Sequence, residues 1–265
     1  MATDMGMDMK TIRKKTQNNS SRYLKTDLHT HILPYVDDGA SDMDRALSLL
    51  RMQSERGVER VVLTPHFYPL RESVEGFLKK REKSYTELLA CVNDVAMPQL
   101  LLGAEVRFTP KLMEIDLRQL TIGQSNYLLL ELPDTRTAPL LDRVVETLIS
   151  QNIIPIFAHI ERCATFRNDP ALLFKFIKKG ALAQISANAL CGSKSSFSVA
   201  CLQHGLAHVI SSDVHKSTDL VDVVKLKKYA AFFEQSDTFA KAIWENSPLP
   251  NFTATPLKRG LLGYR

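Results

Sequence analysis

Short runs rich in Val, Ile and Leu alternate along this chain with longer segments of helical periodicity. This alternation is typical of βα units, in which parallel strands form a sheet and helices cover it. Strands are predicted at 23–28, 60–64, 99–103, 126–132, 153–158, 181–186 and 207–212. Seven strands that each feed a helix predict a single-domain α/β fold resembling a barrel.

Helix signals occupy the segments between these runs. Ser41 with Asp44 three residues later predicts a capping box at the start of the first helix, and Gly57 predicts its end. Further helices are predicted at 73–95, 139–151, 170–179, 197–204, 220–234 and 237–245.

Positive charge is concentrated at the start of the chain. The net charge is +5, but residues 1–25 contain six Lys or Arg against two Asp, which leaves the remainder almost neutral. A body without a strong positive surface argues against a nucleic-acid partner. We expect a flexible basic arm at 1–22, a barrel domain at 23–247 and a tail at 248–265.

Nothing in the sequence predicts export or membrane insertion. No run approaches 18 consecutive apolar residues, and the polar start lacks the apolar stretch of a signal peptide. The four cysteines form no CxxC pair, so we expect reduced thiols in a cytoplasmic protein. None has an Arg six positions later, which argues against a thiolate phosphatase.

Imidazoles and carboxylates follow six of the seven predicted strands. The motifs are DLHTH at 27–31, TPH at 64–66, GAE at 103–105, LLEL around Glu131, AHIER at 158–162 and SSDVH at 211–215. In a parallel barrel these strand ends open onto one face. A set of imidazole and carboxylate groups without thiolate suits Mn, Fe or Zn.

A single His after a strand is more often a hydrogen-bonded loop residue than a metal ligand, and a lone Glu is often an ordinary rim carboxylate. The set as a whole favours a metal site, because burying so many unpaired polar groups would be costly.

The order HTH, VDDG, TPH, GAE, LLEL, AHIER and SSDVH over residues 24–215 resembles the polymerase-and-histidinol-phosphatase (PHP) superfamily. More closely, it is similar to the manganese-dependent protein-tyrosine phosphatases of bacterial capsule and exopolysaccharide systems, the CpsB/YwqE family. The resemblance implies a distorted, TIM-like (β/α)7 barrel that binds three metal ions, with Mn²⁺ expected and Fe or Zn as alternatives.

The resemblance also implies the ligands. One ion would be held by His29, His31, Glu105 and Asp213; a second by Glu105, Glu131 and His159; and the third by Asp38, His66 and His215. Asp37 lies beside Asp38, and spacing alone does not choose between the two.

The expected chemistry is hydrolysis of a phosphate monoester. Divalent ions neutralise its charge and lower the pKa of bound water, so that a metal-bridging hydroxide attacks phosphorus in line. We expect His159 and Arg162 to be catalytic, with Arg162 binding the phosphoryl oxygens; the alternative for Arg162 is a surface salt bridge with Glu161. Relatives tend to carry a second Arg after the last motif, and Lys216 is the candidate substitute here.

The implied substrate is a phosphotyrosine protein, namely a bacterial tyrosine kinase that regulates polysaccharide synthesis. Phe67, Tyr68 and Phe108 are candidates to line a slot for the ring, although packing is the commoner role of such residues. Two alternatives stay open: the same site acting on a small monoester such as histidinol phosphate or on a nucleic-acid phosphodiester, and a nucleic-acid-binding module that uses the basic arm.

Overall fold

Parallel strands form the centre of this computed structural model, which describes residues 24–92, 97–133, 138–192, 195–260 and 263–264. One sheet has the order β1 (Thr26–Thr30), β2 (Arg60–Leu63), β4 (Gln99–Leu102). The other has the order β3 (His66–Phe67), β5 (Glu105–Arg107), β6 (Tyr127–Glu131), β7 (Ile154–Phe157), β8 (Leu182–Ser186), β9 (Val209–Ser211). The strand positions agree with the predicted seven, and the fold is the predicted α/β class.

Two of the predicted strands are interrupted near their ends. Only Thr64 and Pro65 separate β2 from β3, and only Gly103 and Ala104 separate β4 from β5. Because β2 pairs with β4 and β3 pairs with β5, the same two stretches of chain run side by side in both sheets.

The outer strands β1 and β9 also meet. The amide of Asp213 donates to the His29 carbonyl and the amide of His31 to the Val214 carbonyl, both at 2.9 Å. A parallel bridge joins Thr30, the last residue of β1, to Val214, which follows β9.

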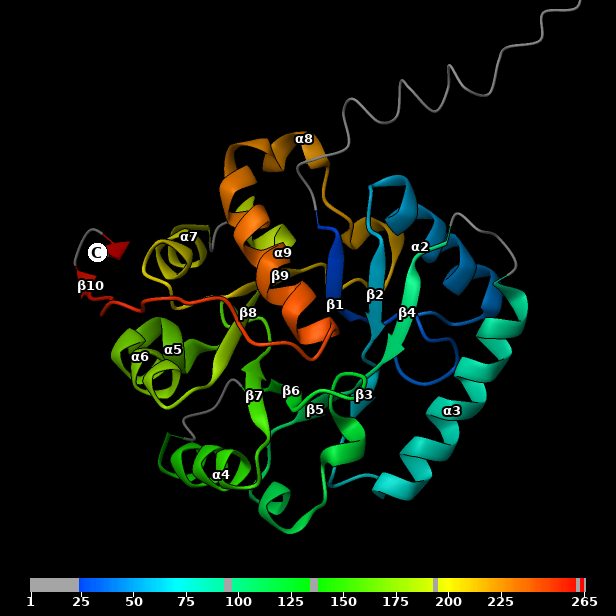
Figure 1. The fold of residues 1–265 in the computed structure, drawn as a ribbon, viewed down its shortest axis with the longest axis horizontal. Helices are drawn as coiled ribbons and strands as arrows, with labels where there is room; N and C mark the ends of the chain where they lie inside the picture. Colours follow the sequence, from blue (N-terminus) through cyan, green and yellow to red (C-terminus); the bar gives the residue numbers. More distant parts are fainter. Residues whose placement is uncertain (1–23, 93–96, 134–137, 193–194, 261–262, 265) are drawn as a thin grey trace, which may run out of the picture.

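Helices surround the strands in Figure 1. They are α2 (Met43–Glu55), α3 (Val74–Cys91), α4 (Ala138–Ser150), α5 (Ala164–Asn168), α6 (Pro170–Lys178), α7 (Ser195–Gln203), α8 (Val223–Leu226) and α9 (Ala230–Trp244). Short 3-10 turns lie at η1 (Pro110–Glu114), η2 (Arg118–Leu120), η3 (Ala187–Leu190), η4 (Ser217–Asp219) and η5 (Lys227–Tyr229). None of the described helices is long and apolar enough to cross a lipid bilayer.

Alternate strand residues pack into two apolar clusters. In β6, Leu129 belongs to one cluster, whereas Leu128 and Leu130 belong to the other. The smaller cluster gathers one face of the strands against Phe239 and Ile243 of α9. Each fully buried side chain of this size contributes about 1.5–3 kcal/mol, so both faces of the strands stabilise the fold.

Two helix predictions are corrected. Asp42, not Ser41, caps α2: its carboxylate accepts from the Arg45 amide at 2.8 Å, and the Ser41 hydroxyl donates to the same carboxylate. Helix α9 continues through 235–236, where a break was predicted, because tertiary contacts use this polar stretch. Ser236 Oγ accepts from the Ile210 amide, and Asp237 accepts from the Lys25 amide.

The predicted arm at 1–22 lies outside the described residues. The described part of the tail touches the body: Thr255 donates its amide to the His204 carbonyl, and Leu257 is buried. Strands β10 (Arg259–Gly260) and β11 (Gly263–Tyr264) pair antiparallel. All four cysteines are free thiols, of which Cys163 and Cys201 are buried.

His208 gives the fold a testable pH dependence. Its Nδ1 accepts from the Ala183 amide, and its ring packs against Phe239 and Phe252. Burial lowers the pKa of His208 to about 4. The unfolded chain therefore binds a proton that the folded chain excludes, and this stability, present above the ordinary pKa of 6.5, is lost as pH falls toward 4.

We expect His208→Gln, which keeps an acceptor without titrating, to make the free energy of unfolding less dependent on pH. Between about pH 7 and about pH 4.5, the wild type should lose about 2 kcal/mol more than the variant in urea titrations. The control is His204→Gln, a less buried residue of the same segment. Equal pH dependence in wild type and His208→Gln would contradict this explanation.

Candidate metal centre

The imidazoles and carboxylates that follow the strands converge on one face. His29 and His31 lie two residues apart along β1 and its extension, so both point to the same side. His66 begins β3, Glu105 begins β5 and Glu131 ends β6. His159 follows β7, and Asp213 and His215 follow β9. Strand order therefore brings together side chains from six separate parts of the sequence.

Glu105 lies at the centre of this cluster and is fully buried. Its Oε2 is 3.1 Å from His29 Nε2, 3.2 Å from His31 Nε2 and 3.1 Å from His66 Nδ1. Its Oε1 is 2.8 Å from His159 Nε2. One carboxylate thus meets four imidazoles, and the register of the strands explains part of this, since His66 and Glu105 are direct neighbours in the sheet.

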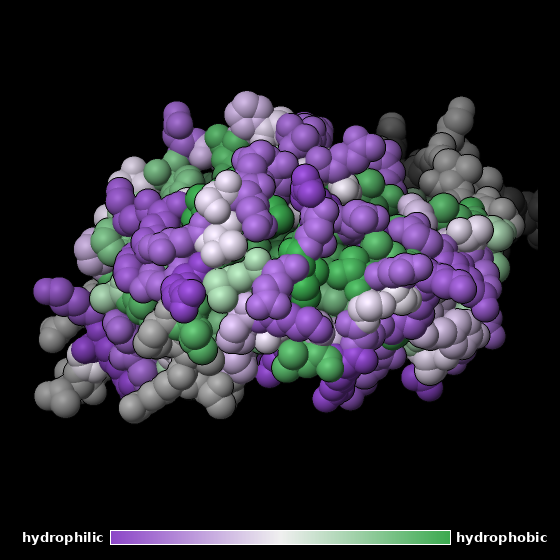
Figure 2. Space-filling model, turned by 90° about the horizontal axis from the view of Figure 1, so that it is seen from below, coloured by the Kyte–Doolittle hydropathy of each residue, from purple (hydrophilic) through white to green (hydrophobic). Residues whose placement is uncertain are grey.

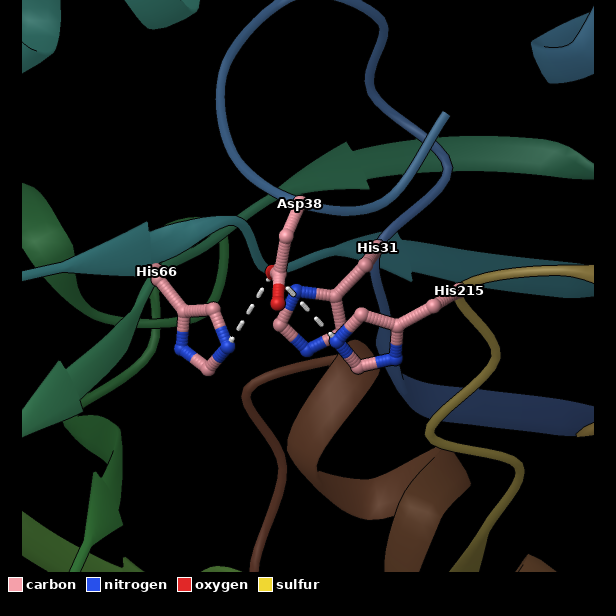
Figure 3. A group of neighbouring side chains, drawn as sticks. All are labelled: His31, Asp38, His66 and His215. Atoms are coloured by element: carbon pink, nitrogen blue, oxygen red, sulfur yellow. Dashed lines mark ion pairs between the residues drawn. The ribbon is translucent and has the colours of Figure 1, made fainter. Parts of the chain in front are cut away.

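A second part of the cluster is more exposed. Asp38 Oδ1 is 3.6 Å from both His66 Nε2 and His215 Nε2. Figure 3 shows Asp38 pointing between these two rings, with His31 beside them. The rings of His31 and His215 stack with their centroids 3.9 Å apart. Ligand atoms of these four residues all lie within 4.8 Å of one another, which is close enough for one ion to reach them.

All nine predicted ligands lie in this cluster, but their grouping differs from the prediction. Candidate ion groups among the described residues are His29, His31, Glu105; His66, Glu105, Glu131; and His31, Asp38, His66, His215. Asp213 Oδ1 is 3.3 Å from His29 Nε2, beside the first group. His159 meets Glu105 without joining a group that contains Glu131. The role of each residue as a ligand stays a prediction.

Buried charges shift the pKa values of these groups. Burial alone would raise the pKa of Glu105, but the nearby charge of His29 and the hydrogen bond from His159 hold it well below its ordinary value. Burial would likewise lower the pKa of His29, yet the charges of Glu105 and Asp213 raise it. In both groups the neighbouring opposite charges outweigh the effect of burial.

Several buried atoms of the cluster lack a hydrogen-bond partner among the described residues. They are Glu105 Oε2, Glu131 Oε2, Asp213 Oδ1 and His66 Nδ1. A buried, unsatisfied carboxylate oxygen is costly. Three imidazole nitrogens lie near Glu105 Oε2, but none has hydrogen-bond geometry to it. Such an arrangement is expected where the lone pairs of the oxygen and of the nitrogens point toward one shared cation. The residues present therefore fit divalent metal ions.

Asp37 and Asp38 have different positions, although they are adjacent in the sequence. The Asp38 side chain is 73% exposed and faces two imidazoles, whereas that of Asp37 is only 4% exposed. Asp37 Oδ2 is 2.6 Å from His31 Nδ1 and accepts a hydrogen bond from the His66 amide at 2.9 Å. Burial alone would raise the pKa of Asp37, but the hydrogen bond and charge of His31 lower it to about 2. Asp37 thus orients the imidazole of a candidate ligand rather than facing the cluster.

Further buried polar groups hold the backbone around the cluster. Gln184 Oε1 accepts from the His159 amide at 2.6 Å. The Asp27 carboxylate accepts hydrogen bonds from the amides of His29 and Ser212. These bonds connect β1 to the segment that follows β9. His159 and Asp213 adopt left-handed backbone conformations with φ of 30° and 54°. Such conformations are unfavourable for these residues and are held by the surrounding structure.

Arg162 pairs with Asp213 Oδ2 in the structure. Among the described residues, the ion pair of Arg162 is with Asp213 and not with its neighbour Glu161, whose side chain is buried. Lys216, the other predicted substrate-binding residue, is exposed beside His215. Both line a pocket of 390 Å³ that also reaches Asp38, Asp213 and His215.

Two cations at the site were not predicted from the sequence. Arg45, in the first turn of α2, lines the same pocket as Arg162. Arg107 Nη1 lies 2.6 Å from Glu131 Oε1 and pairs with Glu131 across β5 and β6. The strand alternation that placed Glu105 on the face also places Arg107 there, since the two are two residues apart. No local signal identified Arg45.

The predicted aromatic slot is mostly absent. Phe67 and Phe108 are buried in the apolar core, where their rings pack against other side chains. Only Tyr68 lies near the cluster, with its ring centroid 5.3 Å from that of His66. Burial, with the nearby charges of Glu131 and Asp38, raises the pKa of Tyr68 to about 12.

Comparisons with known proteins agree with these observations. The family model described as capsular polysaccharide synthesis, CpsB/CapC, matches residues 25–235. CapC of Staphylococcus aureus is 31% identical over 229 residues, which cover 81% of this chain and 88% of that protein. The tyrosine-protein phosphatase YwqE of Bacillus subtilis is 28% identical, and the alignment covers 71% of this chain and 76% of YwqE.

A solved structure has the same fold. It comes from work on YwqE of Bacillus subtilis and CpsB of Streptococcus pneumoniae, described as metal-dependent tyrosine phosphatases. The TM-score is 0.77 at 23% identity, and the alignment covers 88% of this chain and all of that one.

Replacing Asp37 tests whether it positions the imidazole of His31. We expect Asp37→Asn to lower the affinity for Mn²⁺ by about 10- to 100-fold, because a neutral amide orients the imidazole less firmly than a carboxylate. Calorimetric titration of the metal-free protein measures this. Asp44→Asn, at an exposed position in α2, is the control and should bind as the wild type does. Unchanged affinity in Asp37→Asn would show that His31 is positioned by other contacts.

Proposed function

Because this chain belongs to the CpsB/CapC family of capsular polysaccharide synthesis, we propose that it is a metal-dependent phosphatase that hydrolyses phosphotyrosine in proteins. The observation that carries this proposal is the group of His, Asp and Glu side chains around Glu105, next to the guanidinium of Arg162. The names of the relatives support the substrate class, since YwqE and CpsB are tyrosine-protein phosphatases.

We propose that the ligands are His29, His31, Asp38, His66, Glu105, Glu131, His159, Asp213 and His215, with Glu105 shared between ions. Nitrogen and oxygen donors without thiolate suit Mn²⁺, and Fe or Zn are the alternatives. The number of candidate groups supports three ions. When bound, such ions neutralise the charge of the phosphate and lower the pKa of a water molecule enough for it to attack phosphorus.

The protein's own groups bind and orient the phosphate. The guanidinium of Arg162 lies at the mouth of the cluster, about half exposed, and its planar fork can bind two phosphoryl oxygens. Asp213 holds it there in the free protein. His159 contacts Oε1 of Glu105 and His66 lies near Oε2, and the Gln184 contact with the His159 amide fixes the backbone of His159. None of these roles requires a cysteine nucleophile.

Strand pairing supports a more specific description of the fold, a distorted (β/α)7 barrel. If β2 with β3 and β4 with β5 count as one interrupted strand each, the pairings give seven strands in order. The Thr30 to Val214 bridge would join the last strand to the first. We propose this closed arrangement, with the domain at 23–247 between the basic arm 1–22 and the tail 248–265.

The proposed substrate is the phosphorylated tail of a bacterial tyrosine kinase, and the proposed location is the cytoplasm. The family description, which concerns capsule synthesis, supports this biological setting. The free cysteines are compatible with a reducing compartment. The basic arm is not assigned a nucleic-acid partner.

Chelation and metal return test the proposed reaction. We expect purified protein to release phosphate from a phosphotyrosine peptide, to lose this activity in a chelator and to regain it with Mn²⁺. A variant in which all four cysteines are replaced by Ser or Ala should keep the activity, whereas His159→Ala should lose at least about 100-fold in kcat. Normal turnover by His159→Ala would contradict the assignment.

A substrate panel separates this function from its alternatives. The panel contains a phosphotyrosine peptide, histidinol phosphate and single-stranded DNA, each assayed at the same concentration with Mn²⁺. We expect phosphotyrosine to be hydrolysed with the highest kcat/KM. Preference for histidinol phosphate or for DNA would support the corresponding alternative.

Replacing Arg162 tests phosphate binding separately from metal binding. We expect Arg162→Ala to reduce kcat/KM by about 100-fold or more, because a charge-assisted, two-point contact is lost. Metal content, measured by mass spectrometry, should stay that of the wild type. Arg118→Ala, which removes an exposed cation paired with Asp116, is the control. Loss of metal from Arg162→Ala would instead place Arg162 among the groups that stabilise the centre.

A further inference from the structure

Three cations surround the pocket beside the metal centre. The pocket is lined by three candidate metal ligands, Asp38, Asp213 and His215, and by Arg45, Arg162, Lys216, Gly39, Asn188 and Asp219. Arg162 contacts the centre through Asp213. Arg45 comes from α2 and Lys216 from the segment that follows His215, and both residues are exposed. With a volume of 390 Å³, the pocket has room for more than the phosphoryl group itself.

The carboxylates of the pocket are engaged elsewhere. Asp213 pairs with Arg162 and faces His29, and Asp38 faces His66 and His215. Asp219 Oδ2 accepts from the amides of His215 and Lys216 at 3.0 and 2.9 Å. The lining acids are thus directed toward imidazoles, Arg162 or backbone amides, and none of them pairs with Arg45 or Lys216.

Arg45 and Lys216 are correspondingly free to bind an anion. Among the described residues, Lys216 Nζ forms no ion pair, and the Arg45 side chain, 68% exposed, has only Asp42 at 3.6 Å. That pair is exposed on both sides, so it contributes little and can be exchanged for another anion. Two exposed cations that line one pocket, neither of them held in a buried ion pair, favour a negatively charged ligand.

The position of Arg45 is fixed by the loop before α2. A Cβ atom at Gly39 would lie 1.9 Å from the His31 carbonyl oxygen, so only glycine permits this close approach. The Ala40 amide donates to the same carbonyl, and Asp42 caps α2. The loop is thereby held against a candidate metal ligand, and the first turn of α2 stays beside the pocket.

We propose that Arg45 and Lys216 form a subsite for a second anionic group of the substrate, a carboxylate or phosphate on a residue next to the phosphotyrosine. This inference rests on the proposed function, in which Arg162 and the metal centre bind the phosphate that is removed. The subsite selects peptides in which that phosphotyrosine has an acidic neighbour. Because both cations are exposed, their effect is on the capture of substrate and weakens with salt.

A comparison of kcat/KM for different phosphotyrosine peptides tests the subsite. Four phosphotyrosine peptides are compared that differ in the neighbouring residues: Glu, a second phosphotyrosine, Gln or Lys. We expect wild-type kcat/KM to be about fivefold higher with an acidic neighbour than with Gln, and lower still with Lys. The ratio should fall toward one in Arg45→Gln and in the double variant with Lys216→Gln, and at high ionic strength. The Glu and phosphotyrosine arms distinguish carboxylate from phosphate as the favoured anion.

Arg51→Gln and Lys225→Gln are the matched controls, because each removes one exposed cation outside the pocket. Both should keep the wild-type ratio. A ratio near one in the wild type, or an unchanged ratio in the double variant, would overturn the subsite while leaving phosphotyrosine hydrolysis intact. Absence of turnover with every phosphotyrosine peptide would instead contradict the proposed function and the subsite with it.

Discussion

A buried carboxylate surrounded by imidazoles is the interaction on which this structure depends. Glu105 is inaccessible to water, and an isolated ion in such a place would be strongly destabilising. Four imidazole nitrogens within 3.2 Å compensate for that cost, and the two anionic neighbours Asp37 and Asp213 stabilise the imidazoles in turn. Removing one of these groups would leave a buried partner without its opposite charge.

The parallel strands make this convergence possible. Glu105 pairs with His66 on one side, and Arg107 pairs with Glu131 on the other, so neighbours in the sheet become neighbours in the site. The contact of His29 and Asp213 through the backbone brings in the first and last strands. The apolar residues that alternate with these groups are buried on the opposite side of the strands, so the same strands carry both the core and the site.

The sequence predicted the strands and the identities of the clustered residues, because both depend on local patterns. Runs of Val, Ile and Leu predict strands from local sequence alone. The carboxyl ends of parallel strands lie on one face of the fold, so polar groups that follow the strands are expected on that face. The grouping of ligands could not be predicted, since it depends on where side chains from different strands meet. Arg45 was missed for the same reason: it lies among the polar residues of an ordinary helix start, and only the loop around Gly39 brings it to the pocket.

Burial separates two kinds of residue at this site. Glu105, His29 and His31 are fully buried and mutually paired, so a substitution there disturbs charge balance and folding together. Arg45 and Lys216 are exposed, and their replacement leaves no buried charge unpaired. Substitutions in the buried centre are therefore expected to lower the stability of the fold, whereas a change of charge at Arg45 or Lys216 is not. A change of charge at the rim therefore leaves the paired groups of the buried centre as they are.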